Sequence, residues 1–374
     1  MNRPAMKVLR PADRDEWLAV LRECDGHDFY HLPQYHALAE DQGEGEGRLF
    51  VYRENGCVIA LPLLLRPLHG ILGIESAGES RHDASSVYGY AGPVASRAEI
   101  PAATVASFQG ALQETLRAMG VVTAFSRLHP LFKQKLLLEG IGEYRVHGQT
   151  VSMDLTLPPE GQLAQYRSGH KASIKKLQRE GIVCVRDETK RHLPEFISIY
   201  HETMRRVNAD GSYFFGEGYF LKLAEELGDM LQLFVVMAGE TVAAGGLFIQ
   251  CNGILQYHLS GARGIFQSSS PTTSMLDTAR LWGNAIGARV LHLGGGVGSQ
   301  YDSLFRFKAG FSDCRHDFGT WRWIVIPELY RELCDGRRRH DERNGAQAAS
   351  ADFFPAYRCP AVPRLSVPSA IAVS

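Results

Sequence analysis

The sequence predicts an α/β protein made of two similar tandem domains, each with a mixed sheet and helices on its faces. The first observation is a repeat: Leu49-Phe50-Val51 recurs as Leu233-Phe234-Val235, at an offset of 233 − 49 = 184. The same offset, without a gap, aligns three further pairs: Val58 with Val242, Ala60 with Ala244, and Leu63 with Leu247. The second observation is that both halves show the same order of predicted elements. Similarity at a fixed period indicates repeated structural units, so we interpret the chain as an internal duplication.

Each half is expected to run helix, helix, hairpin, helix, strand. The opening helices are predicted over residues 13–23 and 193–207, and each leads into an aromatic stretch and a second helix. The same shift carries Phe29 onto Tyr213 and Tyr35 onto Tyr219. The hairpin turns, 54–56 and 238–240, contain the Gly or Asn that a positive φ favours. Amphipathic helices over 106–120 and 273–287 end in a glycine, which is typical of a left-handed helix cap, and a strand follows each.

The predicted boundary between the halves is at residues 156–161, where Leu-Pro-Pro-Glu-Gly is typical of a linker. This gives an N-terminal domain over 1–158 and a C-terminal domain, with the active cleft, over 159–334. From Asp335 onward the periodicity is weak and Ala, Ser and Pro are frequent. We therefore expect 335–374 to be a loosely structured tail.

Composition narrows the functional classes. The 374 residues have a net charge of −1, so the whole molecule has no general attraction for DNA or membranes. The 7 cysteines form no C-x-x-C pair, which argues against a zinc site and a disulfide framework, and no metal site is expected. Residues 1–13 lack the apolar core of a signal peptide, and the longest apolar run, 58–65, is too short to span a bilayer. The expected location is cytoplasmic, without stable membrane insertion.

Residues 162–180 are predicted to form one basic helix. Arg167, Lys171, Lys175 and Arg179 recur every four residues and would form a cationic stripe. Like charges at this spacing repel each other by a few tenths of a kcal/mol per pair. Either the stripe is an ordinary solvated face, or it is neutralised by phosphates of tRNA or of a nucleotide-linked substrate.

A glycine-rich loop and a Phe-Lys pair stand near the end of the second half. Residues 294–299 read Gly-Gly-Gly-Val-Gly-Ser, in which Gly295 could help to form an anion-binding concavity or a flexible turn. In 304–311, extended alternation would place Phe305 and Phe307 on one face and Lys308 on the other. Lys308 could direct a cation at an oxyanion or a phosphate, although an exposed surface lysine is the simpler interpretation.

Taken in order, several segments resemble the FemAB-like superfamily, whose members carry two tandem GNAT-type domains. They are Asp83-Ala84-Ser85-Ser86-Val87-Tyr88-Gly89-Tyr90-Ala91-Gly92-Pro93, the basic helix, Ser270-Pro271 before a long helix, and Gly294-Gly295 leading to Phe307-Lys308-Ala309-Gly310-Phe311. The resemblance covers residues 25 to 326. It implies tandem GNAT-like domains and transfer of an aminoacyl group from aminoacyl-tRNA, or of an acyl group from a thioester, to an amine.

The resemblance also implies roles for individual residues. Lys308, preceded by Phe307, would meet the donor and the reaction centre, and the helix with Arg167, Lys171 and Lys175 would face a diphosphate. Two features of the peptidoglycan branch are missing: no lysine occurs between Lys7 and Lys133, and no heptads follow Leu193. A muropeptide acceptor is therefore not supported.

Three first-half residues remain open to two interpretations. Asp83 could orient or deprotonate the acceptor amine, or it could cap the following turn. Tyr88 and Tyr90 could line the same cleft, or they could be core aromatics.

The leading hypothesis is an aminoacyl-tRNA-dependent transferase that forms an amide bond by direct attack of an amine. No G-x-S-x-G elbow is present, so a serine acyl-enzyme is not expected. The alternative is an acyl-coenzyme A N-acyltransferase acting on an amino sugar or small metabolite, although residues 261–267 match the usual coenzyme A loop poorly. A second alternative is a non-catalytic protein that binds an anion. No cofactor is expected, since the donor is charged tRNA or, in the alternative, an acyl-coenzyme A.

Overall fold

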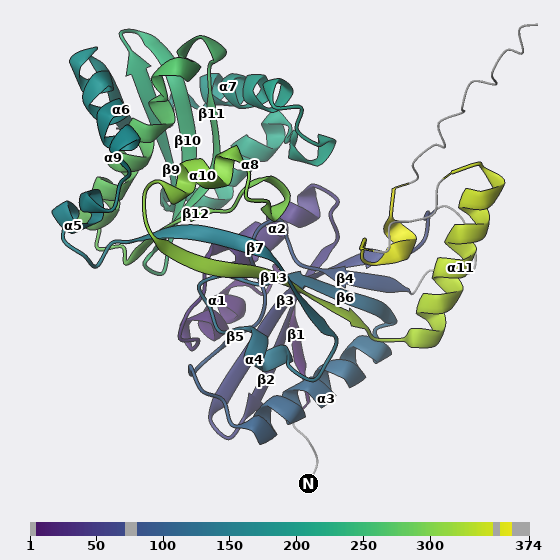
Figure 1. Ribbon diagram of the computed structural model, residues 1–374. Helices are drawn as coiled ribbons and strands as arrows, with labels where there is room; N and C mark the ends of the chain where they lie inside the picture. Colours follow the sequence, from purple (N-terminus) through teal and green to yellow (C-terminus); the bar gives the residue numbers. More distant parts are fainter. Residues whose placement is uncertain (1–4, 72–80, 347–351, 361–374) are drawn as a thin grey trace, which may run out of the picture.

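The computed structural model describes residues 5–71, 81–346 and 352–360. Within these ranges the strands form one mixed sheet of 13 strands, with helices packed on its faces (Figure 1). The α/β fold class predicted from the sequence is confirmed. None of the described helices is long and apolar enough to cross a membrane.

The first half starts with an edge strand and two helices and continues through a hairpin, a crossover helix and two longer strands. Its elements are β1 (Lys7–Leu9), α1 (Arg14–Arg22), η1 (Phe29–His31), α2 (Pro33–Asp41), β2 (Glu46–Glu54), β3 (Cys57–Pro67), β4 (His82–Ser85), β5 (Val94–Ala95), α3 (Ala102–Ala118), β6 (Val121–Arg127), α4 (Lys135–Leu138) and β7 (Glu143–Asp154). The hairpin turn at Asn55 and Gly56 has positive φ at both residues, and so does Gly120 after α3. These are the positions where the sequence predicted left-handed backbone.

The second half repeats this order after two additional helices. Its elements are α5 (Pro159–Ala164), α6 (Ser168–Arg179), β8 (Ile182–Asp187), α7 (Leu193–Arg206), η2 (Gly211–Tyr213), α8 (Glu217–Leu227), η3 (Gly228–Met230), β9 (Leu231–Ala238), β10 (Thr241–Cys251), β11 (Ile254–Ala262), η4 (Gly264–Ser269), α9 (Pro271–Ala285), β12 (Val290–Gly294), η5 (Val297–Ser299), α10 (Ser303–Ala309) and β13 (Cys314–Ile324). The segments matched at the offset of 184 lie in corresponding elements, since 49–51 is in β2 and 233–235 is in β9. An ancestral duplication would produce this correspondence, and it remains our interpretation.

The two halves exchange their last strands. The order across the sheet is β1-β2-β3-β4-β6-β13-β7-β12-β11-β10-β9-β8. β13, from the second half, therefore pairs with β6 of the first, and β7 pairs with β12 of the second. In Figure 1 these two long strands cross the middle of the molecule. The halves are therefore not two independent sheets, although the chain does pass from β7 to α5 in the predicted linker at 156–161.

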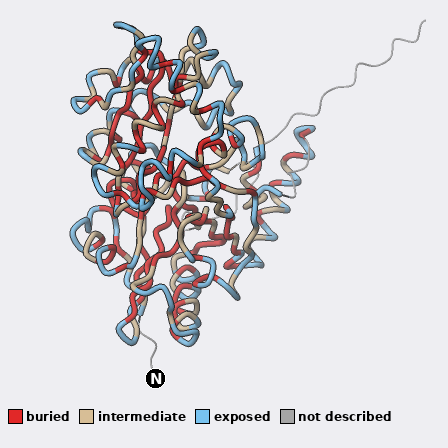
Figure 2. Tube along the Cα trace, turned by 60° about the vertical axis from the view of Figure 1, so that its left-hand side comes forward, coloured by how far each residue is buried: buried red, intermediate tan, exposed pale blue. Residues whose placement is uncertain are grey.

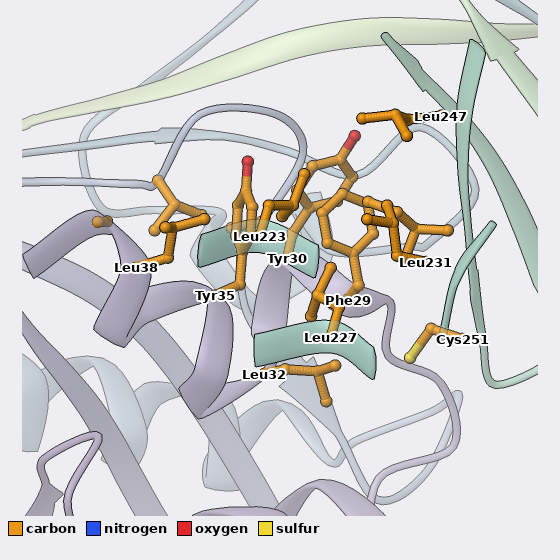
Figure 3. Close-up of a cluster of buried hydrophobic side chains, with 14 of the residues drawn as sticks. Phe29, Tyr30, Leu32, Tyr35, Leu38, Leu223, Leu227, Leu231, Leu247 and Cys251 are labelled. Atoms are coloured by element: carbon orange, nitrogen blue, oxygen red, sulfur yellow. The ribbon is translucent and has the colours of Figure 1, made fainter. Parts of the chain in front are cut away.

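A shared core lies between the helices of the two halves. Figure 2 shows buried segments running along the strands, with exposed backbone concentrated on the outer helices and loops. In Figure 3, residues 29–38 of the first half meet Leu223, Leu227 and Leu231 of the second in one apolar cluster. Because α2 packs directly on α8, the relative position of the halves is set by apolar burial as well as by the exchanged strands.

The expectation of a loosely structured tail from Asp335 is wrong for much of that region. Residues 327–343 form helix α11 (Pro327–Arg343), on which the guanidinium of Arg337 and the carboxylate of Asp341 form a buried pair at 2.9 Å. Tyr357, in η6 (Ala356–Arg358), is fully buried, and its hydroxyl lies 2.9 Å from Thr123 Oγ1 of β6. The sequence did not predict this packing, because only one face of α11 is buried and most of its charged residues remain in solvent. Residues 347–351 and 361–374 lie outside the described part of the chain.

Candidate active site

The candidate site lies where two parallel strands of the second half separate. β11 pairs with β12 only as far as Gln256 opposite His292. Beyond that point β11 stays with β10, whereas β12 ends at Gly294 opposite Val151 of β7. Chain segments and polar side chains enter the space between diverging parallel strands, which is a common place for a ligand site in α/β folds.

The glycine loop after β12 allows close backbone approach. Gly294 has φ of +76°, and a Cβ on Gly296 would lie 2.1 Å from the Gln300 carbonyl oxygen. Asp302 fixes the far side of the loop: its carboxylate accepts hydrogen bonds from the Phe305 amide at 2.8 Å and from the Val297 amide at 3.0 Å. The loop is therefore tightly held rather than a flexible turn, and it starts helix α10 through an Asp N-cap.

Lys308 lies on α10, so the extended alternation predicted for 304–311 is wrong, and so is the simpler interpretation of an exposed lysine. Its side chain is only 8 % exposed, and Nζ donates a hydrogen bond to the Gly295 carbonyl at 2.7 Å. The ammonium also lies 5.8 Å from the centre of the Tyr257 ring. Burial lowers the pKa of Lys308 to about 8, with Asp302 opposing the shift. A buried lysine with a strongly lowered pKa is typical of functional sites.

Tyr90 brings the first half into this site. A Cβ placed on Gly294 would lie 3.4 Å from Lys308 Nζ and 3.5 Å from the Tyr90 hydroxyl, so both groups border the same glycine. The Tyr90 ring packs edge-on against His292 at 5.4 Å. Burial raises the pKa of Tyr90 to about 12, while Arg127 and a hydrogen bond with the Gly295 backbone oppose the rise. Of the two tyrosines predicted to line the cleft, Tyr90 lies beside Lys308.

Tyr88 lies in the aromatic interface between the halves instead. Its carbonyl accepts a hydrogen bond from the Tyr35 hydroxyl at 3.2 Å, and its ring contacts Phe215 at 5.4 Å and His258 at 6.1 Å. Burial raises its pKa well above the ordinary value for tyrosine. The glycine between the two tyrosines explains how they diverge: Gly89 has φ of +111°, and a Cβ there would lie 1.9 Å from the Tyr30 ring.

The basic region is two helices rather than one. α5 ends at Ala164 and α6 begins after Arg167, whose ψ of 152° breaks the helix. Arg167 lies against α10, since its amide donates to the Gly310 carbonyl at 2.8 Å and its guanidinium to the Arg306 carbonyl at 3.4 Å. Lys171 donates to the Ala164 carbonyl at 3.0 Å, and Lys175 is exposed. Of the predicted stripe, Arg167 therefore directly borders the element that carries Lys308.

Phe307 packs between the same two helices. Its ring contacts His170 of α6 at 5.1 Å and Phe311 at 5.4 Å, both edge-on. His170 in turn lies 2.9 Å from the Phe307 carbonyl. Phe307 therefore couples α6 to α10 and is half-buried beside Lys308.

Asp83 does not have the surroundings of a general base. Its carboxylate is fully buried and is bound on one side by Arg66 Nε at 2.7 Å and on the other by Arg358. Both carboxylate oxygens are therefore already engaged by guanidinium groups and are not free to accept a hydrogen bond from an acceptor amine. Asp83 ties β4 to η6 beyond α11, and its contacts do not join it to Lys308. We therefore do not retain it as a catalytic residue.

Sequence reasoning missed His292, a fully buried histidine on β12 in the centre of the site. Its Nδ1 lies 2.7 Å from Gln256 Oε1, and its Nε2 lies 2.9 Å from Thr150 Oγ1. Burial, followed by His129, His316 and Lys308, lowers its pKa well below the ordinary value, so the ring is neutral. The available signal was a polar residue inside the apolar run 290–293, directly before the glycines.

The chain is similar to known proteins, over its second half in sequence and over most of its length in fold. Residues 164–308 match the family model for the acetyltransferase (GNAT) domain, a segment that ends at Lys308. The structure is similar to the crystal structure of FemX, with a TM-score of 0.65 at 12% identity over 88% of this chain and 99% of that one. It is also similar to L-PGS from Bacillus licheniformis, with a TM-score of 0.52 at 16% identity over 86% of this chain and 95% of that one. No curated protein matches the chain.

The fold and the family match together define a transferase of the acyltransferase class. More narrowly, the match to the GNAT acetyltransferase domain covers residues 164–308, and the chain as a whole shares its fold with FemX and L-PGS.

Proposed function

We propose that the protein transfers an aminoacyl group from aminoacyl-tRNA to an amine, with Lys308 at the reaction centre. The observation that carries this proposal is the buried ammonium of Lys308 at the separation of β11 and β12. An ammonium has three N–H bonds, of which the Gly295 carbonyl occupies one. No other acceptor in the described part of the chain binds this ammonium, so the remaining N–H bonds are available to a substrate oxygen.

In the proposed reaction, a neutral acceptor amine attacks the carbonyl carbon of the aminoacyl ester. A C–N bond forms and negative charge develops on the carbonyl oxygen, where Lys308 stabilises it in a site that excludes water. The ester C–O bond then breaks, and the leaving ribose oxygen takes the proton released by the amine. Tyr90 and the neutral His292 border the centre and would position the reactants.

The charge next to the site supports a long polyanionic donor. α6 carries Lys175, Lys176 and Arg179 in exposed positions, and its first turn is anchored to α10 through Arg167. A nucleic acid backbone can follow such a row because it presents one phosphate after another. The region expected to bind coenzyme A phosphates folds as the 3-10 helix η4 instead of an open glycine turn. The match to an acetyltransferase model keeps acyl-coenzyme A as the second candidate donor.

One assay separates the candidates. The purified protein is incubated with charged tRNA or with acetyl-coenzyme A, and deacylation or thiol release is followed with a panel of amines. Amine-dependent deacylation that is abolished by ribonuclease pretreatment supports the proposal. Turnover that survives ribonuclease, or thiol release alone, contradicts it in favour of the second donor. Absence of turnover with either donor would leave the non-catalytic anion-binding protein.

The Lys308→Met variant is the internal control for this assay. Methionine keeps the length and apolar packing of the buried stem but removes the charge. Loss of turnover with an unchanged thermal unfolding midpoint, or a raised one, would locate the chemistry at Lys308. Unchanged turnover would remove Lys308 from the site.

A further inference from the structure

A cavity of about 720 Å³ lies in the first half, between β5, α3 and α4 (Figure 1), and we call it the α3 cavity. Asn252 and Arg289 of the second half contribute to its lining. Lys308, Tyr90 and His292 do not line it, so the cavity is separate from the candidate active site. Well-packed interiors leave few voids larger than a water molecule, whereas small-molecule sites have volumes of this size.

The α3 cavity lies beside the point in the first half that corresponds to the candidate active site. β4 and β6 run parallel and form a ladder as far as Ser85 opposite Phe125. Beyond Ser85 the chain leaves β4 and pairs with β3 as β5, while α4 follows β6 as α10 follows β12. Space beside separating parallel strands commonly holds a ligand in α/β folds. The described lining residues include no histidine, cysteine or buried lysine, so we expect binding here without acyl transfer.

The interior of the α3 cavity is apolar. Its lining includes Val94 of β5, Val105 and Ala106 of α3, and Leu136 and Leu137 of α4. Leu136 is 54 % exposed, so a large apolar side chain lies in contact with water at the edge of the cavity. An apolar ligand would remove this surface from water, which favours its binding.

The end of the cavity between the two halves carries more positive than negative charge. Residues 25–27 meet the second half there, since Asn252 Nδ2 donates to a carbonyl of this segment at 3.4 Å and Arg289 donates to the Asn252 carbonyl at 3.1 Å. The charged lining residues at this end are Lys133, Arg289 and Asp25. Neither cation forms an ion pair with a described residue, and two cations against one carboxylate leave a net positive charge.

The other charged side chains of the lining do not reverse this asymmetry. Glu139 stands at the far end, after α4, where its backbone carbonyl accepts a hydrogen bond from Gln109 at 2.8 Å. Arg97 and Glu99 lie two residues apart in the segment before α3 and offset each other. The described lining therefore places its excess of positive charge at the end between the halves and its excess of negative charge at the other. Such an arrangement orients an elongated ligand that has one anionic end.

A wall of two side chains separates the cavity from the candidate active site. Phe132 and Gln134 both line the cavity. The Phe132 ring stacks on His129 at 4.2 Å, and Gln134 Nε2 donates to the Ala91 carbonyl at 2.8 Å. The Tyr90 ring lies beyond them, at 6.2 Å from His129. A ligand in the cavity therefore contacts this wall and does not occupy the reaction centre.

We infer that the α3 cavity binds a separate small molecule, an amphiphile with an apolar chain and an anionic head group of the carboxylate type. The chain lies against α3 and α4, and the head lies at Lys133 and Arg289, whose N–H groups suit carboxylate oxygens. The molecule is neither the donor nor the acceptor of the proposed reaction, so this site does not depend on the proposed function.

Isothermal titration calorimetry with decanoate, below the concentration at which it forms micelles, tests the site without any donor or acceptor. One molecule of decanoate is expected to bind per chain, and each methylene added between octanoate and decanoate should tighten binding by up to about fourfold. Decylammonium, which has the same chain and the opposite charge, should bind at least about tenfold more weakly. Absence of decanoate binding, or equal affinity for the two head groups, would overturn the inference.

Two pairs of variants locate the ligand. Ala106→Trp would fill the cavity and should abolish decanoate binding, whereas Ala103→Trp, at an exposed position of α3 outside the lining, should leave it unchanged. Lys133→Gln should weaken decanoate binding at least about threefold, while Lys135→Gln, on α4 but outside the lining, should have no effect. If circular dichroism shows that Ala106→Trp does not fold, the two lysine variants decide. Equal affinities in Lys133→Gln and Lys135→Gln would contradict the inference.

Lys308→Met separates this site from the candidate active site. This variant should bind decanoate as tightly as wild type, and loss of binding would place the ligand at the reaction centre and overturn the inference. If decanoate binding depends on Ala106 but charged tRNA is never deacylated, the site in the α3 cavity stands and the proposed function fails. If deacylation requires Lys308 while decanoate does not bind, the proposed function stands and the inference fails.

Discussion

The two halves of the molecule place different residues at corresponding points of one fold. In the second half, β12 is followed by glycines and then by α10, which carries Lys308 two residues before Gly310. In the first half, β6 is followed by α4, in which Leu138 stands two residues before Gly140. Leu138 is 4 % exposed and packs in the apolar core, whereas Lys308, at 8 %, buries a cation.

The two halves also differ in the partners of their buried ionisable side chains. After β6, His129 Nε2 lies 3.1 Å from Asp28 Oδ2, and both side chains are fully buried, so each of these two polar groups has a partner. Lys308 forms no ion pair within the described residues, and its neighbours are a backbone carbonyl and an aromatic ring. A paired buried charge stabilises a fixed arrangement, while an unpaired one with a shifted pKa is available for chemistry. The placement of ionisable side chains, more than the fold, therefore distinguishes the half in which we propose the active site.

The largest effect on kcat is expected when the charge of Lys308 is removed while the size of its side chain is kept. Lys308→Met is expected to lower kcat for aminoacyl transfer about 100-fold or more, because removal of one oxyanion-stabilising group typically costs that much. The matched first-half variant, Leu138→Met, keeps the apolar volume and should leave kcat within about twofold. Steady-state rates with charged tRNA measure both. If both variants lost the same fraction of kcat, the charge of Lys308 would have no specific role in catalysis.

The glycine loop, which the first half lacks, gives the second prediction. Gly296→Ala should reduce turnover at least about tenfold and lower the thermal unfolding midpoint, because its Cβ would lie 2.1 Å from the Gln300 carbonyl and 2.4 Å from Asp302. The control is Gly169→Ala inside α6, where nothing lies within 4 Å of the new Cβ. That variant should keep activity and gain slightly in stability. A tolerated alanine at 296 would show that the loop does not hold α10 in place.

The sequence predicted the order of elements well because hydrophobic periodicity and glycine turns are local signals. It could not predict the exchange of β7 and β13, because strand pairing depends on contacts distant in sequence. The same limit explains the errors in the site. Asp83 and Arg358 are separated by 275 residues, so no spacing pattern in the sequence could predict that Arg358 binds the Asp83 carboxylate. Lys308 was selected by its resemblance to a family motif, whereas its burial follows only from packing in three dimensions.

The pH dependence of Lys308 is the third prediction. Its pKa is about 8 in the folded protein against 10.5 for a free lysine, so the cation is present below about pH 8 and lost above it. Turnover should therefore decline above pH 8, after any rise caused by deprotonation of the acceptor amine. Between about pH 8 and 10.5 the unfolded chain binds more protons, so the free energy of unfolding should rise by up to about 3 kcal/mol relative to Lys308→Met. Denaturant unfolding at several pH values measures this difference. A wild-type curve parallel to that of Lys308→Met would mean that the lysine titrates normally.

The smallest expected effect concerns α6, which has no counterpart ahead of β1 in the described part of the first half. Lys175→Gln combined with Arg179→Gln should weaken binding of charged tRNA severalfold and flatten its dependence on salt, because two exposed cations no longer displace counterions. Activity with acetyl-coenzyme A, if any, should not change. The control pair is Arg338→Gln with Arg339→Gln on α11, which removes the same charge elsewhere. If both double variants reduce tRNA affinity equally, the stripe is an ordinary solvated face, and the second half owes its activity to α10 and the glycine loop alone.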